Sequence, residues 1–203
     1  MEQYEVESWW PKGDVFEVAV GAILTQQTKW SNVLKVLQEL RSKDVLSADS
    51  LVDMDIDELE TVLRPVGFFR QKSVRLKTLA LFIQREYQSD MNLMMAKDLR
   101  QTRLELLELP GIGPETADSI LLFGASHPVF IAANYCLRIL NRLGIIESSD
   151  YEEVRQFVEN EIGNDPDILA EFYALLVEHA KQYCLSKPKC PQCFLQDLCF
   201  FKT

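Results

Sequence analysis

Residues 109–121 read LPGIGPETADSIL, and this stretch decides the fold of the 203-residue chain. Gly111 and Gly113 permit backbone angles that other residues avoid, and Pro110 ends the structure that precedes them. Apolar residues recur at helical spacing on both sides of the turn, at Leu104, Leu106, Leu107 and Leu109 before it and at Ala117, Ile120, Leu121 and Gly124 after it. The pattern predicts a helix, a short glycine turn and a second helix.

The second of these helices has the features of a phosphate-binding N-terminus. Pro114 suits a first helical turn, and Glu115 suits the positive end of the helix dipole. The backbone N–H groups at such a start have no partner within the helix, so they can bind an anion such as a phosphate group. An ordinary helical turn that contains glycines is the simpler alternative.

The charges of the chain are unevenly distributed. The net charge of −10 argues against nucleic acid as a partner, yet residues 64–77 carry five bases and no acid, while residues 147–178 carry ten acids and one base. Such a protein can meet DNA with one face; a generally acidic protein with solvated lysines is the alternative. Apolar runs stay short of a membrane span, and the first residues do not read as a signal peptide. We therefore expect a cytoplasmic protein (nucleoid-associated in a prokaryote) that has no membrane partner.

The hairpin sequence resembles the helix-hairpin-helix of the DNA glycosylase superfamily that includes endonuclease III. In that family, LPG, a hydrophobic residue and Gly are followed by a helix with Thr-Ala near its start. The resemblance covers nearly the whole chain, and it implies double-stranded DNA with a damaged base as the partner. It also implies that Gly111, Gly113 and Thr116 contact that DNA.

Two stretches resemble the parts of the family that deal with an extruded nucleotide. The loop 24–30 reads LTQQTKW, and Gln27 falls where the family places a Gln in the gap left in the duplex. Trp30 falls where the bacterial 3-methyladenine glycosylases carry an aromatic that stacks on the extruded base. Trp9, Trp10 and Pro11 resemble the segment that lines the pocket in that branch; from composition alone, packing of two tryptophans is the alternative.

Residues 64–72 read RPVGFFRQK and resemble the family segment that wedges into the DNA stack. Phe68 follows Gly67 and holds the wedge position, with a place in the core as the alternative. Arg70 and Lys72 belong to the basic segment, and we expect them to bind DNA.

One position departs from the family pattern. Members that cleave the glycosidic bond usually carry an Asp at the start of the helix after the hairpin, whereas this chain has Ala133, in a register anchored by Tyr135, Arg138 and Arg142. Alanine offers neither a charge nor a hydrogen-bonding group, so the resemblance implies impaired catalysis. A natural impaired member and an engineered inactive variant are both compatible with the sequence.

A second departure concerns lyase chemistry. Bifunctional members place a Lys two residues after the last hairpin glycine, where it forms a Schiff base with the sugar. This chain has Glu115 there, and a carboxylate cannot form that intermediate. Glu at this position resembles the monofunctional 3-methyladenine branch, whose reaction stops at an abasic site.

Four of the five cysteines lie within 16 residues of one another near the C-terminus. Cys184, Cys190, Cys193 and Cys199 resemble the [4Fe–4S] loop of endonuclease III, with one residue fewer in the first interval. The resemblance implies that their thiolates hold a [4Fe–4S] cluster; a zinc site with four cysteine ligands is the alternative. We interpret Cys136 as a buried apolar residue, and His179 as a surface or packing residue that binds no metal.

These features together predict an all-α, two-lobed helix-hairpin-helix glycosylase fold with a C-terminal iron–sulfur loop at 184–199. We expect a central helical barrel at 15–126 and a second lobe made of 1–14 and 127–203. Apolar periodicity predicts one helix over 49–63, another from Lys72 onward and two between 151 and 183.

The resemblance implies a monomeric base excision repair enzyme without lyase activity, which flips and excises alkylated purines such as 3-methyladenine. A glycosylase for oxidised or mismatched bases is one alternative. A lesion-binding protein that flips a base but never cleaves the glycosidic bond is the other, and Ala133 supports it.

Overall fold

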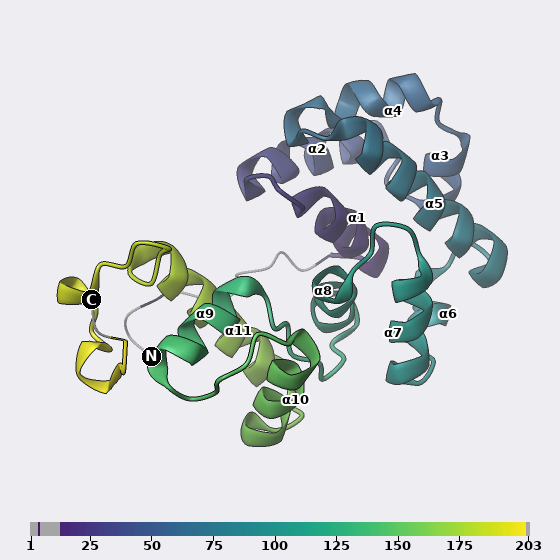
Figure 1. Cartoon of the computed structure of the whole chain (residues 1–203). Helices are drawn as coiled ribbons and strands as arrows, with labels where there is room; N and C mark the ends of the chain where they lie inside the picture. Colours follow the sequence, from purple (N-terminus) through teal and green to yellow (C-terminus); the bar gives the residue numbers. More distant parts are fainter. Residues whose placement is uncertain (1–3, 5–12, 202–203) are drawn as a thin grey trace. The chain divides into compact units, whose positions relative to one another are not determined.

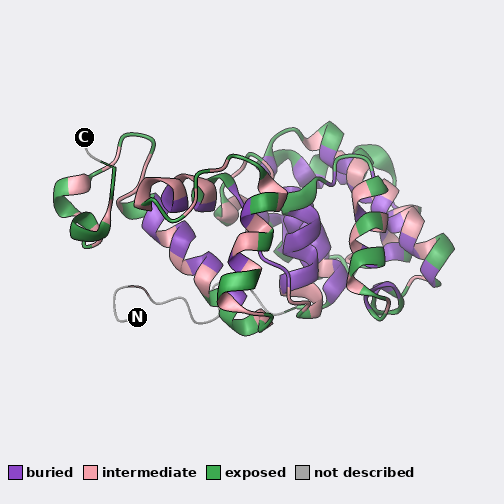
Figure 2. Ribbon diagram, turned by 60° about the horizontal axis from the view of Figure 1, so that its bottom comes forward, coloured by how far each residue is buried: buried purple, intermediate pink, exposed green. Residues whose placement is uncertain are grey.

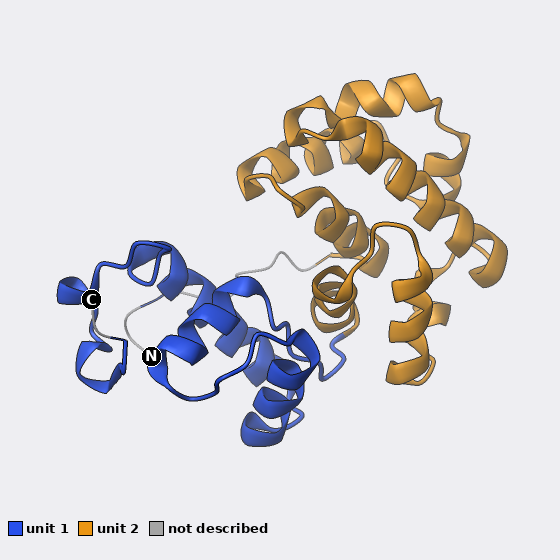
Figure 3. Ribbon diagram, in the orientation of Figure 1, with its two compact units in different colours: residues 1–10, 126–203 blue, residues 11–125 orange. Residues whose placement is uncertain are grey.

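The protein is seen in a computed structural model that describes Tyr4 and residues 13–201. These residues form helices and connecting loops without any β-strand, which confirms the predicted all-α fold (Figure 1). Contacts divide the chain into two compact units, Pro11–Ala125 and Met1–Trp10 with Ser126–Thr203 (Figure 3). Within the described part of the chain, none of the helices has the length and apolar character that crossing a membrane requires.

The unit that spans Pro11–Ala125 is organised around its first helix. Its elements are α1 (Val15–Thr25), α2 (Trp30–Ser42), α3 (Ala48–Asp53), α4 (Ile56–Leu63), the 3₁₀ helix η1 (Arg64–Val66), α5 (Phe69–Tyr87), α6 (Met91–Met95), α7 (Leu99–Glu108) and α8 (Pro114–Ala125). All residues from Val15 to Leu24 except Glu17 are buried, because α1 contacts α2, α5, α6 and α8. A Cβ at Gly124 of α8 would lie 2.9 Å from Val15 Cγ2, so glycine permits the close approach of α8 to α1.

Three helix boundaries in this unit differ from the prediction. The helix expected over 49–63 is two helices, because Met54 is extended and the Asp55 side chain accepts hydrogen bonds from Asp57 N and Glu58 N to start α4. Helix α5 begins three residues before Lys72, and the five-residue α6 has no counterpart in the prediction. Such a short helix has too few turns to show a period.

The other unit packs three helices over its own core. Helix α11 (Pro166–Gln182) contacts α9 (Asn134–Leu143) and α10 (Tyr151–Ile162), and the short 3₁₀ helices η2 (Cys190–Gln192) and η3 (Gln196–Leu198) follow it. Phe130 is fully buried against the rings of Phe172 and Tyr173. Cys136 is buried, as predicted, and α10 and α11 are the two helices expected between 151 and 183. In both units the buried residues follow the faces that helices turn toward one another (Figure 2).

Acidic residues begin most of the helices. Side chains cap seven N-termini, and the capping residues are Asp14, Ser47, Asp55, Asp90, Asp98, Asp150 and Asp165. Part of the negative charge of the chain therefore has a structural role at the positive ends of helix dipoles. Helices α2, α5 and α9 start differently, at Lys29, Phe68 and Ala133, where the side chain forms no capping hydrogen bond.

Candidate functional site

The hairpin predicted from LPGIGP joins α7 to α8. Ile112 N donates to Leu109 O at 3.1 Å, and Gly111 adopts a φ of +83°, a left-handed value that favours glycine. Below the turn, Arg103 Nε and Nη2 donate to the two carboxylate oxygens of the fully buried Asp118 at 2.6 and 3.1 Å. This paired bond fixes α7 against α8. A Cβ at Gly113 would meet no atom within 4 Å, and Gly113, Pro114 and Glu115 are exposed, so the first residues of α8 face solvent.

Gln26 connects the hairpin to the loop after α1. Its Nε2 donates to Gly111 O and to Thr116 Oγ1, both at 3.0 Å, and its Oε1 accepts from Arg75 Nη1 on α5. Thr116 is buried, and its hydroxyl oxygen accepts the hydrogen bond from Gln26. Gly111 is close to the same network, because a Cβ at that position would lie 2.1 Å from Arg75 Nε.

The prediction that Lys72 binds DNA is not supported. Lys72 is 1% exposed, and its Nζ donates to Leu24 O and Val66 O, both at 2.9 Å. Burial lowers the pKa of Lys72, and the nearby positive charge of Arg75 lowers it further. A lysine ammonium has three donors and needs acceptors when it is buried, so Lys72 instead joins the end of α1 to the turn before Phe68. These two hydrogen bonds hold the Gln27 loop next to the Phe68 turn.

Gln27 and Phe68, the two residues predicted to enter the DNA stack, share an unusual backbone conformation. Their φ values are +56° and +46°, in the left-handed region that residues with a Cβ rarely adopt. Phe68 is 58% exposed, which decides against the core alternative, and Gln27 is exposed as well. Backbone strain of this kind costs about 1–3 kcal/mol per residue and is often found at functional sites.

The other predicted contact residues have different surroundings. Arg70 is 82% exposed on α5, where it stacks on the Phe69 ring and pairs at 3.7 Å with Glu60. Trp30 starts α2 and is half-buried, with its ring against Gly21 of α1. Trp9, Trp10 and Pro11 lie outside the described residues.

Ala133 is the N-cap residue of α9. It is 1% exposed, its backbone is extended, and its carbonyl accepts from Cys136 N at 2.8 Å. An Asp at an N-cap position would bring its carboxylate to the free N–H groups of the first helical turn. The methyl group of Ala133 offers the helix no acceptor.

Glu115 is the second residue of α8 and contacts solvent. Nearby protein atoms remove part of the water around its carboxyl group, and this desolvation raises the pKa of Glu115. Glu115 follows Pro114 in the first turn of α8, so an acid occupies the position at which the resemblance places the lysine of bifunctional members.

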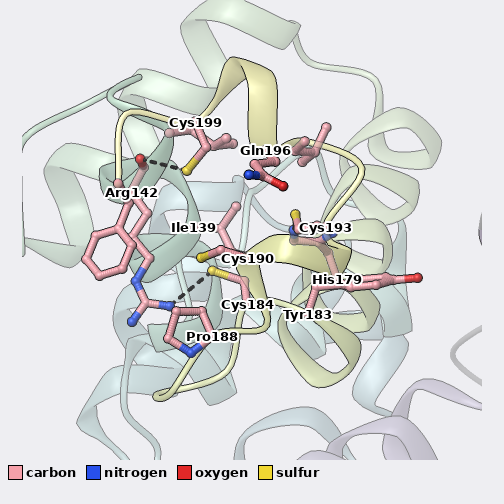
Figure 4. Close-up of a pocket in the computed structure, with 13 residues that line it drawn as sticks. Ile139, Arg142, His179, Tyr183, Cys184, Pro188, Cys190, Cys193, Gln196 and Cys199 are labelled. Atoms are coloured by element: carbon pink, nitrogen blue, oxygen red, sulfur yellow. Dashed lines mark hydrogen bonds between the residues drawn. The ribbon is translucent and has the colours of Figure 1, made fainter. Parts of the chain in front are cut away.

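The four C-terminal cysteines line one pocket (Figure 4). None of them forms a disulfide, and Arg142 on α9 holds the loop by donating from Nη1 to Cys184 Sγ at 3.3 Å and to Leu185 O at 2.7 Å. Among residues 13–201 and Tyr4, no group of three or more His, Cys, Asp and Glu side chains is placed to hold a metal ion. A four-iron cluster binds each thiolate to a different iron, so its ligands surround a volume and do not meet at one ion.

His179, predicted to be a surface or packing residue, is buried and lies at the edge of this pocket. Tyr4 OH lies 3.0 Å from His179 Nδ1, and Cys193 Sγ lies 3.5 Å from His179 Nε2. Burial lowers the pKa of His179. The pKa of Tyr4 is raised to about 12, mainly by burial and to a smaller extent by the electrostatic effect of Tyr183. If the Tyr4 hydroxyl donates to Nδ1, a neutral His179 imidazole carries its proton on Nε2, the nitrogen that faces Cys193.

Comparison with known proteins gives the family of this chain. Residues 20–163 match the HhH-GPD superfamily base excision DNA repair protein family. The chain belongs to this family. It is 37% identical over 204 residues to a Methanocaldococcus jannaschii protein named as a candidate DNA repair glycosylase, with 100% of this chain and 93% of the relative covered.

Two solved structures of DNA repair enzymes are similar to this chain. One is the Helicobacter pylori 3-methyladenine DNA glycosylase bound to 1,N6-ethenoadenine, with a TM-score of 0.75, 32% identity and coverage of 86% of this chain and 88% of that one. The other is a trapped covalent intermediate of endonuclease III with DNA, with a TM-score of 0.77, 22% identity and coverage of 93% and 84%. The second likeness shows the fold alone. The protein is therefore a DNA glycosylase of the base excision repair type.

The contacts of Gln26, Arg75 and Arg142, and the contact of His179 with Cys193, were not predicted from the sequence. Gln26 and Gly111 are 85 residues apart in the sequence, and Arg142 and Cys184 are 42 apart, so no local pattern connects them. The position of Gln26 beside Gln27, in a polar loop between apolar helices, was the one available signal.

Proposed function

We propose that this HhH-GPD protein is a monofunctional glycosylase that flips and excises alkylated purines such as 3-methyladenine, and that Ala133 impairs excision. The monofunctional part rests on Glu115, which puts a carboxylate where a Schiff-base amine is needed. The substrate class is supported by the likeness to the H. pylori 3-methyladenine enzyme and by Trp30.

The loops of residues 13–125 suit base flipping. The N–H groups at the start of α8 bind a backbone phosphate, the exposed Phe68 wedges into the stack, and Gln27 fills the gap. Trp30, together with Trp9, Trp10 and Pro11, receives the base. N3-methylated adenine is cationic in DNA, and an aromatic face attracts a cation by about 0.5–2 kcal/mol.

The catalytic requirement falls on position 133. A cationic base leaves readily, so the enzyme needs little acid catalysis. It must stabilise the positive charge that develops on the sugar, and a fixed carboxylate does this. Ala133 supplies no charge, so excision by this protein is slow.

The cysteine loop is proposed to hold a [4Fe–4S] cluster through Cys184, Cys190, Cys193 and Cys199. The thiol set and the hydrogen-bond donors Arg142 and His179 fit such a group, since donors to ligand sulfurs accompany these clusters. When bound, a cluster supplies a structural crosslink and a one-electron redox centre. The base-excision steps above use none of its chemistry.

Single-turnover release of 3-methyladenine tests the function. The protein and Ala133→Asp are compared on the same methylated duplex, and strand cleavage is followed alongside. We expect Ala133→Asp to release the base about 10²–10³ times faster, the effect of one electrostatic stabiliser, with unchanged DNA affinity and no strand cleavage. Equal rates would show that position 133 is not the catalytic position, and strand cleavage would contradict the monofunctional assignment.

Ala133 also favours a second function, a protein that binds lesions without excision. This alternative predicts tight binding to methylated duplex with no base release by the chain as it stands. A third possibility, a glycosylase for oxidised or mismatched bases, predicts release from those duplexes in place of methylated ones, so all three substrates belong in the assay.

A further inference from the structure

Three loops that the proposed function assigns to DNA are bonded to one another within residues 13–125. Lys72 joins the end of α1, which precedes Gln27, to the turn that precedes Phe68. Gln26 joins the same loop to the hairpin through Gly111 O and Thr116 Oγ1. Lys72 and Arg75 are three residues apart on α5, so one face of this helix supports all three loops.

Both N–H donors of the Gln26 amide, and its oxygen, form hydrogen bonds inside the protein. A primary amide has two N–H donors and one carbonyl acceptor. Gly111 O and Thr116 Oγ1 take the donors, and Arg75 Nη1 takes the acceptor. Gln26 thus has no N–H donor left for a DNA phosphate, although its neighbour Gln27 is exposed and has a left-handed backbone.

We infer that Gln26 is a positioning residue that connects the grip of the hairpin on a backbone phosphate to the insertion of Gln27 into the gap. This inference rests on the proposed role of Gln27. The hairpin carbonyl that Gln26 binds belongs to Gly111, which lies in the glycine turn just before the N–H groups of α8 that are proposed to bind phosphate. The hairpin geometry therefore fixes the orientation of the Gln26 side chain, and the backbone of Gln26 fixes the residue that follows it.

Arg75 makes this connection sensitive to the hairpin backbone. Any side chain at position 111 would meet Arg75 Nε at 2.1 Å and would push the guanidinium away from Gln26 Oε1. Glycine at 111 is thus required twice, for its positive φ and for the space that Arg75 fills.

The test uses Gln26→Met, Gln27→Ala and the double variant, each measured for affinity to a duplex with a stable abasic-site analogue and to an intact duplex. We expect Gln26→Met to lower the preference for the abasic duplex roughly tenfold, a size typical of losing a small set of neutral hydrogen bonds. Gln27→Ala should lower it similarly, and the double variant should lose no more than Gln27→Ala alone, because Gln26 acts through Gln27.

Gln84→Met is the matched control. Gln84 also lies on α5 and donates to a distant residue, Asp49, at 2.8 Å, but Asp49 belongs to none of the three loops. The Gln84→Met protein should prefer the abasic duplex over the intact duplex as strongly as the unsubstituted protein does. Gln26→Glu is the second variant: it keeps the acceptor for Arg75 and loses the donors to Gly111 O, so it should behave as Gln26→Met does while remaining folded.

Additive effects of Gln26→Met and Gln27→Ala would overturn the inference, as would equal losses on both duplexes. The abasic analogue has no base, so an incorrect substrate class for the enzyme leaves this result unchanged. The base-release assay reports on the substrate class separately.

Discussion

At residue scale, position 133 combines two roles that substitutions can separate. An N-cap side chain with an oxygen acceptor stabilises α9, and a carboxylate at the same position also stabilises positive charge on a sugar. Seven described helices use Asp or Ser for the first role, whereas α9 uses Ala133 and has neither.

We expect Ala133→Asn and Ala133→Asp to raise the free energy of unfolding by about 0.5–2 kcal/mol, because both supply the missing cap. Asp alone should accelerate base release, since Asn has no charge. Urea unfolding of the three proteins measures the first effect and single-turnover assays the second. Destabilisation by both substitutions would mean that the buried site around Ala133 has no room for a longer side chain.

Trp30 has a structural contact as well as its proposed role in base stacking. We expect Trp30→Ala to reduce the preference for methylated over undamaged duplex by about 1–3 kcal/mol, the usual contribution of an aromatic stacked on a base. Trp30→Phe keeps a ring over Gly21 and should retain most of that preference. If Trp30→Ala weakens binding to both duplexes equally, the ring serves the packing of α2 on α1 and not the base.

At the scale of single elements, the helices without side-chain caps are the informative ones. Helices α2 and α5 begin beside Trp30 and Phe68, and α9 begins at Ala133, all positions that the proposed function places near DNA. A side-chain cap would occupy N–H groups that can otherwise bind a phosphate.

Lys72 and Arg70 lie two residues apart on α5, and substitution should affect stability at the first and DNA binding at the second. Lys72→Met leaves Leu24 O and Val66 O without their donor, so we expect a loss of about 2–4 kcal/mol in the free energy of unfolding. Arg70→Met is the control: its side chain is exposed, so stability should change little, while the salt dependence of DNA binding should fall by about one phosphate contact. Unchanged stability of Lys72→Met would contradict the assigned role of its buried ammonium.

The hairpin was predictable from sequence, because the glycines, prolines and apolar spacing that specify it lie within a few turns of one another. The break between α3 and α4 was not predicted, since the apolar period continues through the capping residue Asp55. Lys72 was misassigned because a lysine in a basic segment ordinarily points to solvent, and only tertiary contacts show that two backbone carbonyls face it. The Gln26 network depends on contacts across more than 80 residues, which no period in the sequence reports.

At the scale of the whole molecule, we expect the proposed [4Fe–4S] cluster and the C-terminal loop to depend on each other for their stability. Purified protein should contain about four iron and four sulfide per chain, and removal of iron by a chelator should speed amide exchange over residues 184–201. Amides that now bond across the loop, such as Lys189 N to Tyr183 O and Phe201 N to Arg142 O, report this directly. Colourless protein with one zinc per chain would contradict the cluster and favour the zinc alternative.

The left-handed backbone of Gln27 and Phe68 has a consequence for laboratory evolution. Glycine at either position relieves backbone strain and removes only an exposed side chain, so a selection for thermal stability alone is expected to enrich glycine there. A selection for repair of alkylated DNA in living cells should reject the same substitutions. Sequencing both selected populations would then mark, without any ligand or structure of a complex, the two residues at which this fold gives up stability for contact with its substrate.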